Sequence, residues 1–187
     1  MVHHSPIQGL YGMADASWGD PLAQYRMLAE EGVSVVQFRC KNWIDSRLLE
    51  VVRQAGSDGP LRIVNDRTPV AQAAGCWVHL GQDDGADPAL PFGRSTHHLR
   101  DLAQIGSAAY IGFGPVFAST TKAGVRDPRG VELLAEVVRQ SPVPVVAIGG
   151  IDSRNIDAVR RTGVAAWAVI GAIWGSADPR AAIRSLR

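Results

Sequence analysis

The sequence has few cysteines, almost no net charge and no long apolar run. Its 187 residues include 2 cysteines and carry a formal net charge of +1. Such a small charge excludes binding driven by a strong field of one sign, so we expect neither nucleic acid nor a membrane surface as a partner. No apolar segment is long enough to span a bilayer. The N-terminus has no basic segment followed by an apolar one, so we expect no secretory signal.

The two cysteines point to a reducing compartment. Cys40 and Cys76 show no CxxC spacing. We therefore expect two reduced thiols in a cytoplasmic protein, neither a disulfide framework nor a zinc site.

Strand-like and helix-like segments alternate along a chain whose length suits a single domain over residues 1–187. Short apolar runs, typical of parallel strands covered on both faces, occupy residues 9–14, 35–39, 61–64, 77–80, 92–95, 109–113, 143–148 and 166–170. Helices are expected at residues 21–31, 46–54, 69–74, 98–105, 131–140, 155–162 and 178–186. The caps expected for three of these helices are Asp20, Asp45 or Ser46, and Asp178.

This alternation predicts an α/β fold, a compact (β/α)₈ TIM barrel. The unit is short, about 23 residues on average, near the lower limit for such barrels. Gly32, Gly75 and Gly163 each lie between an expected helix and the next strand, where glycine ends helices in the left-handed conformation. An open doubly wound sheet would need a glycine-rich phosphate turn after the first strand, and residues 9–19 contain none.

Polar residues follow several of the predicted strands directly. The apolar run 61–64 leads into Asn65, Asp66 and Arg67, and the run 77–80 leads into Asp83 and Asp84. The carboxyl ends of parallel strands meet at one face of a barrel, where ligands bind. Asp66 and Asp84 are of the type that suits Mg²⁺, which would imply a phosphate or diphosphate substrate. Asp83 is a competing ligand, and each carboxylate could instead cap a turn or helix.

A second group of residues favours an anionic ligand. Gln37, Arg39 and Lys41 alternate along a strand and its exit, so all three face the same side. A barrel-interior stripe of this kind is costly unless it meets an anion.

Glycines and hydroxyl groups favour phosphate at other strand ends. Gly149, Gly150 and Gly171 follow the last two strands, where barrels commonly bind phosphate. The alternative is that these glycines only make tight turns. The loop 112–124 carries three hydroxyl groups and Lys122, which suit oxyanion capture, although such loops are usually just solvated.

Two histidines are candidates for different roles. His97 follows a strand end, where it could act as an acid or base. His79 lies within a strand, and we expect it to be partnered inside the core.

Together these motifs resemble those of the thiamine phosphate synthase family, a group that includes the TenI-type thiazole tautomerases. The resemblance covers nearly the whole chain. It rests on the segments Val36-Gln37-Phe38-Arg39-Cys40-Lys41, Val64-Asn65-Asp66-Arg67, His79-Leu80-Gly81-Gln82-Asp83-Asp84, Ser95-Thr96-His97, Gly112-Phe113-Gly114-Pro115-Val116-Phe117, Thr121-Lys122 and Ala147-Ile148-Gly149-Gly150-Ile151.

The resemblance implies a Mg²⁺-dependent barrel enzyme that joins a pyrimidine diphosphate to a thiazole phosphate and releases pyrophosphate. It implies that Asp66 and Asp84 hold Mg²⁺, and that Arg39, Lys41, Lys122 and His97 are catalytic. The residues that it implies for substrate binding are Gln37, Arg39, Lys41, Asn65, Ser95, Ser119, Thr121, Lys122, Gly150, Ile170 and Gly171.

The chain departs from the family pattern at several positions. Cys40 stands where an acidic or polar residue is usual, Ala118-Ser119 replace Pro-Thr, and Gly171 replaces a phosphate-binding serine. Two alternatives therefore stay open: a thiazole tautomerase using His97 for proton transfer, and a non-catalytic sensor of thiamine phosphates. The sequence also leaves open whether the chain forms a homo-oligomer.

Overall fold

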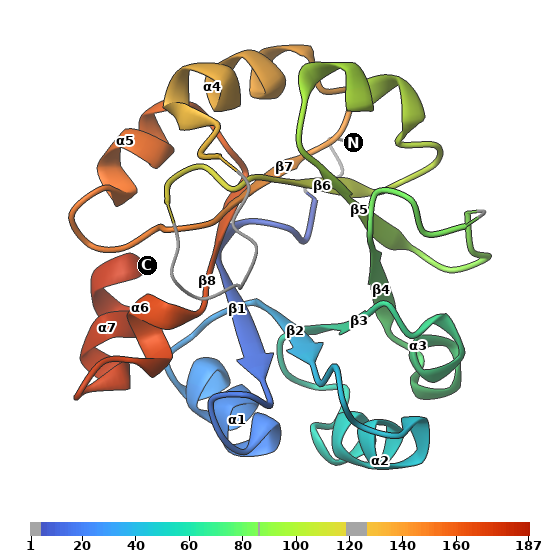
Figure 1. Cartoon of the computed structure of the whole chain (residues 1–187). Helices are drawn as coiled ribbons and strands as arrows, with labels where there is room; N and C mark the ends of the chain where they lie inside the picture. Colours follow the sequence, from blue (N-terminus) through green and yellow to red (C-terminus); the bar gives the residue numbers. More distant parts are fainter. Residues whose placement is uncertain (1–4, 86, 119–126) are drawn as a thin grey trace.

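Eight parallel strands close into a barrel in strict chain order (Figure 1). The computed structural model describes residues 5–85, 87–118 and 127–187. The ring closes where Gly9 of the first strand pairs with Ala166 of the last. The predicted (β/α)₈ fold is therefore confirmed. The strands are β1 (Gly9–Asp15), β2 (Val35–Arg39), β3 (Leu61–Asn65), β4 (Trp77–Leu80), β5 (Phe92–Thr96), β6 (Tyr110–Phe113), β7 (Val145–Ile148) and β8 (Ala166–Val169).

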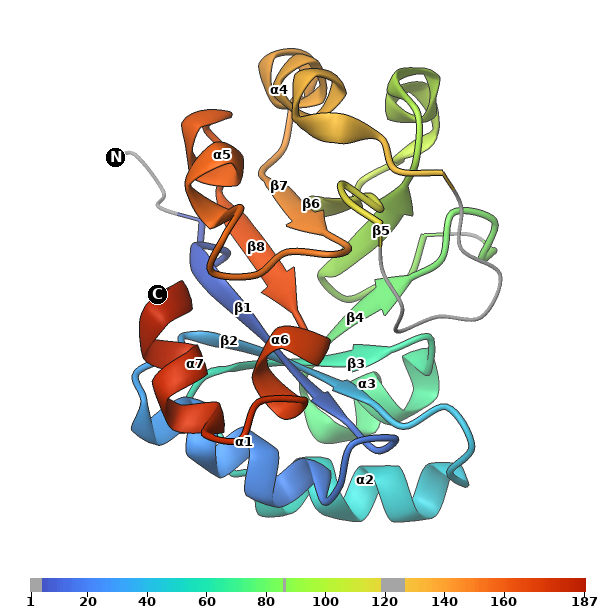
Figure 2. The ribbon, with the colours of Figure 1, turned by 60° about the vertical axis from the view of Figure 1, so that its left-hand side comes forward.

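Helices surround the ring of strands, as both ribbon views show (Figures 1 and 2). Among the described residues, no helix combines the length and apolarity needed to cross a membrane. The helices are α1 (Pro21–Glu30), α2 (Asp45–Gln54), α3 (Thr68–Ala74), the 3₁₀ helix η1 (Leu99–Gln104), α4 (Gly130–Gln140), α5 (Ile156–Arg161), α6 (Gly171–Trp174) and α7 (Pro179–Leu186).

Two of the three predicted helix caps are confirmed. Asp20 accepts a hydrogen bond from the Leu22 amide, and Asp178 accepts one from the Ala181 amide, both at 3.0 Å. The cap predicted for α2 is wrong, because that helix begins at Asp45 and has no side-chain cap. The Asp45 carboxylate instead pairs with Arg67 across the loop at 2.5 Å.

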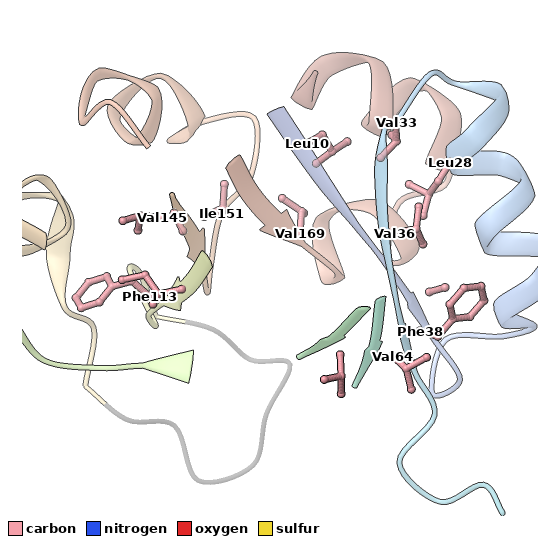
Figure 3. Close-up of a cluster of buried hydrophobic side chains, with 14 of the residues drawn as sticks. Leu10, Leu28, Val33, Val36, Phe38, Val64, Phe113, Val145, Ile151 and Val169 are labelled. Carbon is pink, nitrogen blue, oxygen red and sulfur yellow. The ribbon is translucent and has the colours of Figure 1, made fainter. Parts of the chain in front are cut away.

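The core has two layers because successive strand residues face opposite sides. The larger layer lies between strands and helices, where Leu10, Leu28 and Val36 are labelled in Figure 3. Helix α1 packs so closely that a Cβ atom at Gly12 would lie 2.7 Å from Leu28 Cδ1. The smaller layer fills the barrel interior and consists of Ile7, Tyr11, Met13, Val35, Ile63, Tyr110, Val146, Ala166 and Ala168.

Neighbouring leucines on α4 offer a matched test of the outer layer. Leu134 is fully buried, whereas Leu133 is only partly buried. We expect Leu134→Ala to lower the free energy of unfolding by about 2–5 kcal/mol, because it leaves a cavity beneath the helix. Leu133→Ala should lower the free energy of unfolding by a clearly smaller amount. Equal losses in urea denaturation of the two variants would contradict this packing.

Candidate active site

A cavity of about 880 Å³ opens within the barrel and receives residues from all eight strands. It brings together most of the residues that the sequence predicts for substrate binding or catalysis. Ser119, Thr121 and Lys122 lie outside the described residues. Those on the cavity wall are Gln37, Arg39, Asn65, Ser95, His97, Gly150, Ile170 and Gly171.

Arg39 is held by a carboxylate that sequence reasoning missed. Its Nη1 lies 2.5 Å from Oδ2 of Asp15, which is 2 % exposed. The other Asp15 oxygen accepts hydrogen bonds from the Ser17 amide and hydroxyl, at 2.9 and 2.6 Å. The charge of Arg39 is thus partly neutralised within the protein. The sequence did contain a signal for this pair, because Asp15 is a polar residue at the end of a strand. In the structure it lies opposite Arg39 in the β1–β2 register.

Arg67, the third residue of the polar β3 end, braces a neighbouring loop. It donates to Asp45 at 2.5 Å and to the Lys41 carbonyl oxygen at 3.0 Å. These contacts anchor the segment between β2 and α2, on which the exposed Lys41 lies. Arg67 therefore braces the segment that carries Lys41, a residue that does not line the cavity.

Asp66 and Asp84 form a carboxylate pair at the ends of β3 and β4. Asp66 has a φ of +62°, a conformation unusual for a residue other than glycine. Asn65 Nδ2 donates to Asp66 Oδ2 at 2.5 Å, and the Gly81 amide donates to Asp84 Oδ2 at 2.6 Å. Burial raises the pKa of Asp66, and the neighbouring Asp84 carboxylate raises it further. The Asn65 hydrogen bond and the charges of Lys41 and Arg39 lower this pKa only in part, so it stays above its ordinary value.

This pair fits a hard divalent cation. A cation between the carboxylates would relieve the repulsion that raises the pKa of Asp66. No group of three or more His, Cys, Asp or Glu side chains suited to a metal occurs in the described ranges. A cation held by two carboxylates completes its shell with water or phosphate oxygens, which is typical of Mg²⁺.

Arg94 organises the loop that carries Asp84. Its side chain is buried, and its Nη1 donates to the Asp84 carbonyl oxygen at 3.1 Å. Its Nη2 pairs with Asp87 Oδ1 at 3.0 Å. A buried arginine in β5, on the same side of the strand as Phe92, thus fixes the backbone of the loop after β4 that carries Asp84, a role that no local pattern indicates.

Glycine is required at the β7 end for two physical reasons. Gly149 and Gly150 have φ values of +102° and +65°. A Cβ atom at Gly150 would lie 2.3 Å from the Ala118 carbonyl oxygen, so the β6 loop leaves no space for a side chain. These glycines therefore do make tight turns, and phosphate binding by them stays a prediction. They also line the cavity beside Ile170 and Gly171, at the place predicted for phosphate.

The two candidate histidines differ in their surroundings. His79 is bonded inside the barrel, as predicted, with Nδ1 2.9 Å from the Tyr110 hydroxyl and Nε2 3.0 Å from Ser95 Oγ. His97 Nδ1 donates to the Gly114 carbonyl oxygen at 2.6 Å, and its ring lines the cavity. This bond fixes the orientation of the His97 ring toward the β6 loop.

The fold and cavity define a class: a (β/α)₈ barrel whose cavity is lined by Arg39 and by glycine turns, with two carboxylates, Asp66 and Asp84, after neighbouring strands. Residues 10–173 match the family model TMP-TENI, described as thiamine monophosphate synthase. The chain belongs to this family.

Individual relatives agree with this assignment. The thiamine-phosphate synthase of Anaeromyxobacter dehalogenans is 41% identical over 94% of this chain and 85% of the relative. That of Synechococcus sp. (strain CC9311) is 42% identical over 83% of this chain but only 48% of the relative, so the chain spans about half the length of that protein. The solved thiamine phosphate pyrophosphorylase from Pyrococcus furiosus superposes with a TM-score of 0.84 at 30% identity, covering 98% and 95% of the two chains.

The carboxylate pair makes a testable electrostatic prediction. Asp84→Asn removes a like charge near Asp66, so we expect the raised pKa of Asp66 to fall toward its ordinary value. Carboxyl ¹³C NMR titration of the metal-free protein measures this change. Asp83→Asn is the matched control and should leave the titration of Asp66 nearly unchanged. A pKa of Asp66 that responds more to Asp83 than to Asp84 would contradict the pairing.

Proposed function

We propose that this chain is a thiamine phosphate synthase. It would join the diphosphate of 4-amino-5-hydroxymethyl-2-methylpyrimidine to a thiazole phosphate, giving thiamine phosphate and pyrophosphate. The observation that carries the proposal is the carboxylate pair Asp66–Asp84 beside a cavity lined by Arg39 and Asn65. Relatives that carry this name match most of the chain, which supports the synthase over the tautomerase and sensor alternatives.

The reaction that we propose needs no protein nucleophile. The bond between the pyrimidine methylene carbon and the diphosphate oxygen breaks, and its electron pair leaves with pyrophosphate. The electron-rich aminopyrimidine stabilises the resulting cation, and the lone pair of the thiazole nitrogen forms the new carbon–nitrogen bond. The protein therefore contributes charge neutralisation for the leaving group and close positioning of the two rings.

The described residues divide this work between them. Asp66 and Asp84 would hold Mg²⁺, which neutralises diphosphate charge when bound. Arg39, fixed by Asp15, and Lys41 would add positive charge around the same group. Lys122, Ser119 and Thr121 are assigned to the two substrates from the family resemblance alone.

The thiazole phosphate would bind at the opposite wall of the cavity. Gly150, Ile170 and Gly171 line that wall and expose backbone at the ends of β7 and β8. Since Gly171 has no hydroxyl group, we propose that backbone amides replace the serine contact that is usual in the family.

Purified protein tests the proposal directly. With both phosphorylated substrates and Mg²⁺, we expect thiamine phosphate and pyrophosphate to form in equal amounts. Asp66→Asn and Asp84→Asn should each lower kcat/KM on the order of 10²–10³, by analogy with the loss of one transition-state charge contact. Asp83→Asn is the matched control and should keep most of the activity. No product from the unmodified protein would refute the proposal.

The tautomerase alternative makes a different prediction. It requires Mg²⁺-independent isomerisation of a thiazole carboxylate phosphate, with His97 moving the proton. His97 does line the cavity, so the alternative has a candidate base. We expect no such isomerisation when the product is followed by NMR. Isomerisation that is lost in His97→Ala would establish the tautomerase.

The setting that we propose follows from these substrates. Both are small phosphorylated molecules, and we propose that the chain acts on them in the cytoplasm. Both described cysteines are free and buried, which is compatible with a reducing compartment.

A further inference from the structure

A continuous chain of hydrogen bonds crosses the barrel interior, and all of its members line the cavity. Gln37 Nε2 donates to the Tyr11 hydroxyl at 2.9 Å, and the Tyr11 and Tyr110 hydroxyl oxygens are 2.8 Å apart. The Tyr110 hydroxyl lies 2.9 Å from His79 Nδ1. Finally, His79 Nε2 lies 3.0 Å from Ser95 Oγ. This relay, formed by Gln37, Tyr11, Tyr110, His79 and Ser95, links β2, β1, β6, β4 and β5.

Gln37 and Ser95, at the two ends of the relay, are among the residues that the family resemblance implies for substrate binding. Gln37 and Ser95 both line the cavity. The two tyrosines between them have no assigned role, although Tyr11 is 2 % and Tyr110 0 % exposed. Burial raises the pKa of both phenols, so both keep their protons at neutral pH. Each tyrosine can therefore donate one hydrogen bond.

The donors and acceptors favour one direction along the relay. An amide nitrogen only donates, so the Tyr11 oxygen accepts from Gln37. Tyr11 then donates to Tyr110, and Tyr110 donates to His79 Nδ1. If Tyr110 instead donated to Tyr11, the Tyr11 hydroxyl proton would need a different acceptor. Among the described side chains, the Tyr11 hydroxyl bonds only to Gln37 Nε2 and to the Tyr110 hydroxyl, so no acceptor would be left for that proton. A buried donor without an acceptor is costly.

The direction determines what each end offers a ligand. His79, accepting at Nδ1, carries its proton on Nε2 and donates to Ser95 Oγ. The Ser95 hydroxyl proton then points to another acceptor, such as a ring nitrogen. At the other end, Gln37 uses its amide nitrogen for Tyr11 and keeps its carbonyl oxygen for a donor, such as an exocyclic amine.

The central rings are tightly confined. A Cβ atom at Gly93 would lie 2.1 Å from Tyr110 Cζ, and one at Gly112 would lie 3.1 Å from His79 Cε1. Glycine at both positions makes room for these rings. Trp77 also stacks on the Tyr110 ring, with centroids 6.4 Å apart. The hydroxyl positions are therefore set by packing before any ligand binds.

We propose that Tyr11 and Tyr110 are positioning residues that give the relay one direction and thereby select a 4-aminopyrimidine over its 4-oxo analogue. The amine and ring nitrogen of a 4-aminopyrimidine offer a donor and an acceptor, which complement Gln37 and Ser95. The oxo analogue carries an acceptor and a ring N–H in their place. Its acceptor would then face the Gln37 carbonyl oxygen, and its N–H would face the Ser95 hydroxyl proton. This proposal rests on the synthase function for its ligand, while the direction of the relay is independent of it.

The tautomer of His79 tests the direction without any substrate. We expect ¹⁵N NMR of the full chain to show the neutral His79 ring protonated at Nε2, with Nδ1 accepting. In Tyr110→Phe the Nδ1 resonance should shift, because its donor is gone. Tyr25→Phe is the matched control, since its hydroxyl bonds the Pro60 carbonyl oxygen instead. A His79 ring protonated at Nδ1, or an Nδ1 resonance unchanged in Tyr110→Phe, overturns the relay direction.

Kinetics test the selection. We expect Tyr110→Phe to raise KM for the pyrimidine diphosphate about tenfold and to reduce the preference over the 4-oxo analogue by a similar factor. KM for the thiazole phosphate should stay unchanged, and Tyr25→Phe should behave as the unmodified protein. Tyr11→Phe, which breaks the relay at its other tyrosine, should give the same pattern.

The outcomes separate the two proposals. If both Michaelis constants change equally, or the preference for the amine survives in both variants, the positioning role is overturned. If the unmodified protein makes no thiamine phosphate, the synthase function fails and the pyrimidine selection fails with it. The His79 tautomer then still decides the direction of the relay.

Discussion

The pairing of β1 with β8 is the constraint on which the rest of this structure depends. Once that pairing closes the ring, all eight strands run in one direction and their carboxyl ends meet around a common opening. Polar residues that are far apart in the chain then share one cavity, and their charges interact at short range. The outer face of the strands is apolar, whereas the inner face carries both apolar and polar side chains. The polar side chains inside the barrel find hydrogen-bond partners because the closed ring brings other strands opposite them.

Those partners determine what the cavity can do. Arg39 would be an unpaired, half-buried cation without Asp15, and the two residues meet only through the β1–β2 register. Asp66 and Asp84 show the opposite arrangement, since burial and the nearby Asp84 charge both raise the pKa of Asp66. Two nearby carboxylates of this kind are the arrangement on which the proposed Mg²⁺ site rests.

Much of the fold could be predicted because the relevant signals are local. Apolar runs of strand length, helix caps such as Asp20 and left-handed glycines such as Gly75 act within a few residues of each other. The prediction failed at Asp45, whose carboxylate is drawn from a capping role by Arg67, a residue distant in sequence. The nearby strand ends also led correctly to the cavity wall at Gln37, Asn65 and Ser95.

By itself the sequence determined the order of strands and helices and the kinds of side chain that follow each strand, because both depend on local pattern. Only the tertiary structure decided which of those side chains touch. The Asp15–Arg39 pair, the support of the Asp84 loop by Arg94 and the relay from Gln37 to Ser95 all join different strands. Such contacts depend on the strand register and on the closure of the ring, and neither can be deduced from the spacing of residues along the chain.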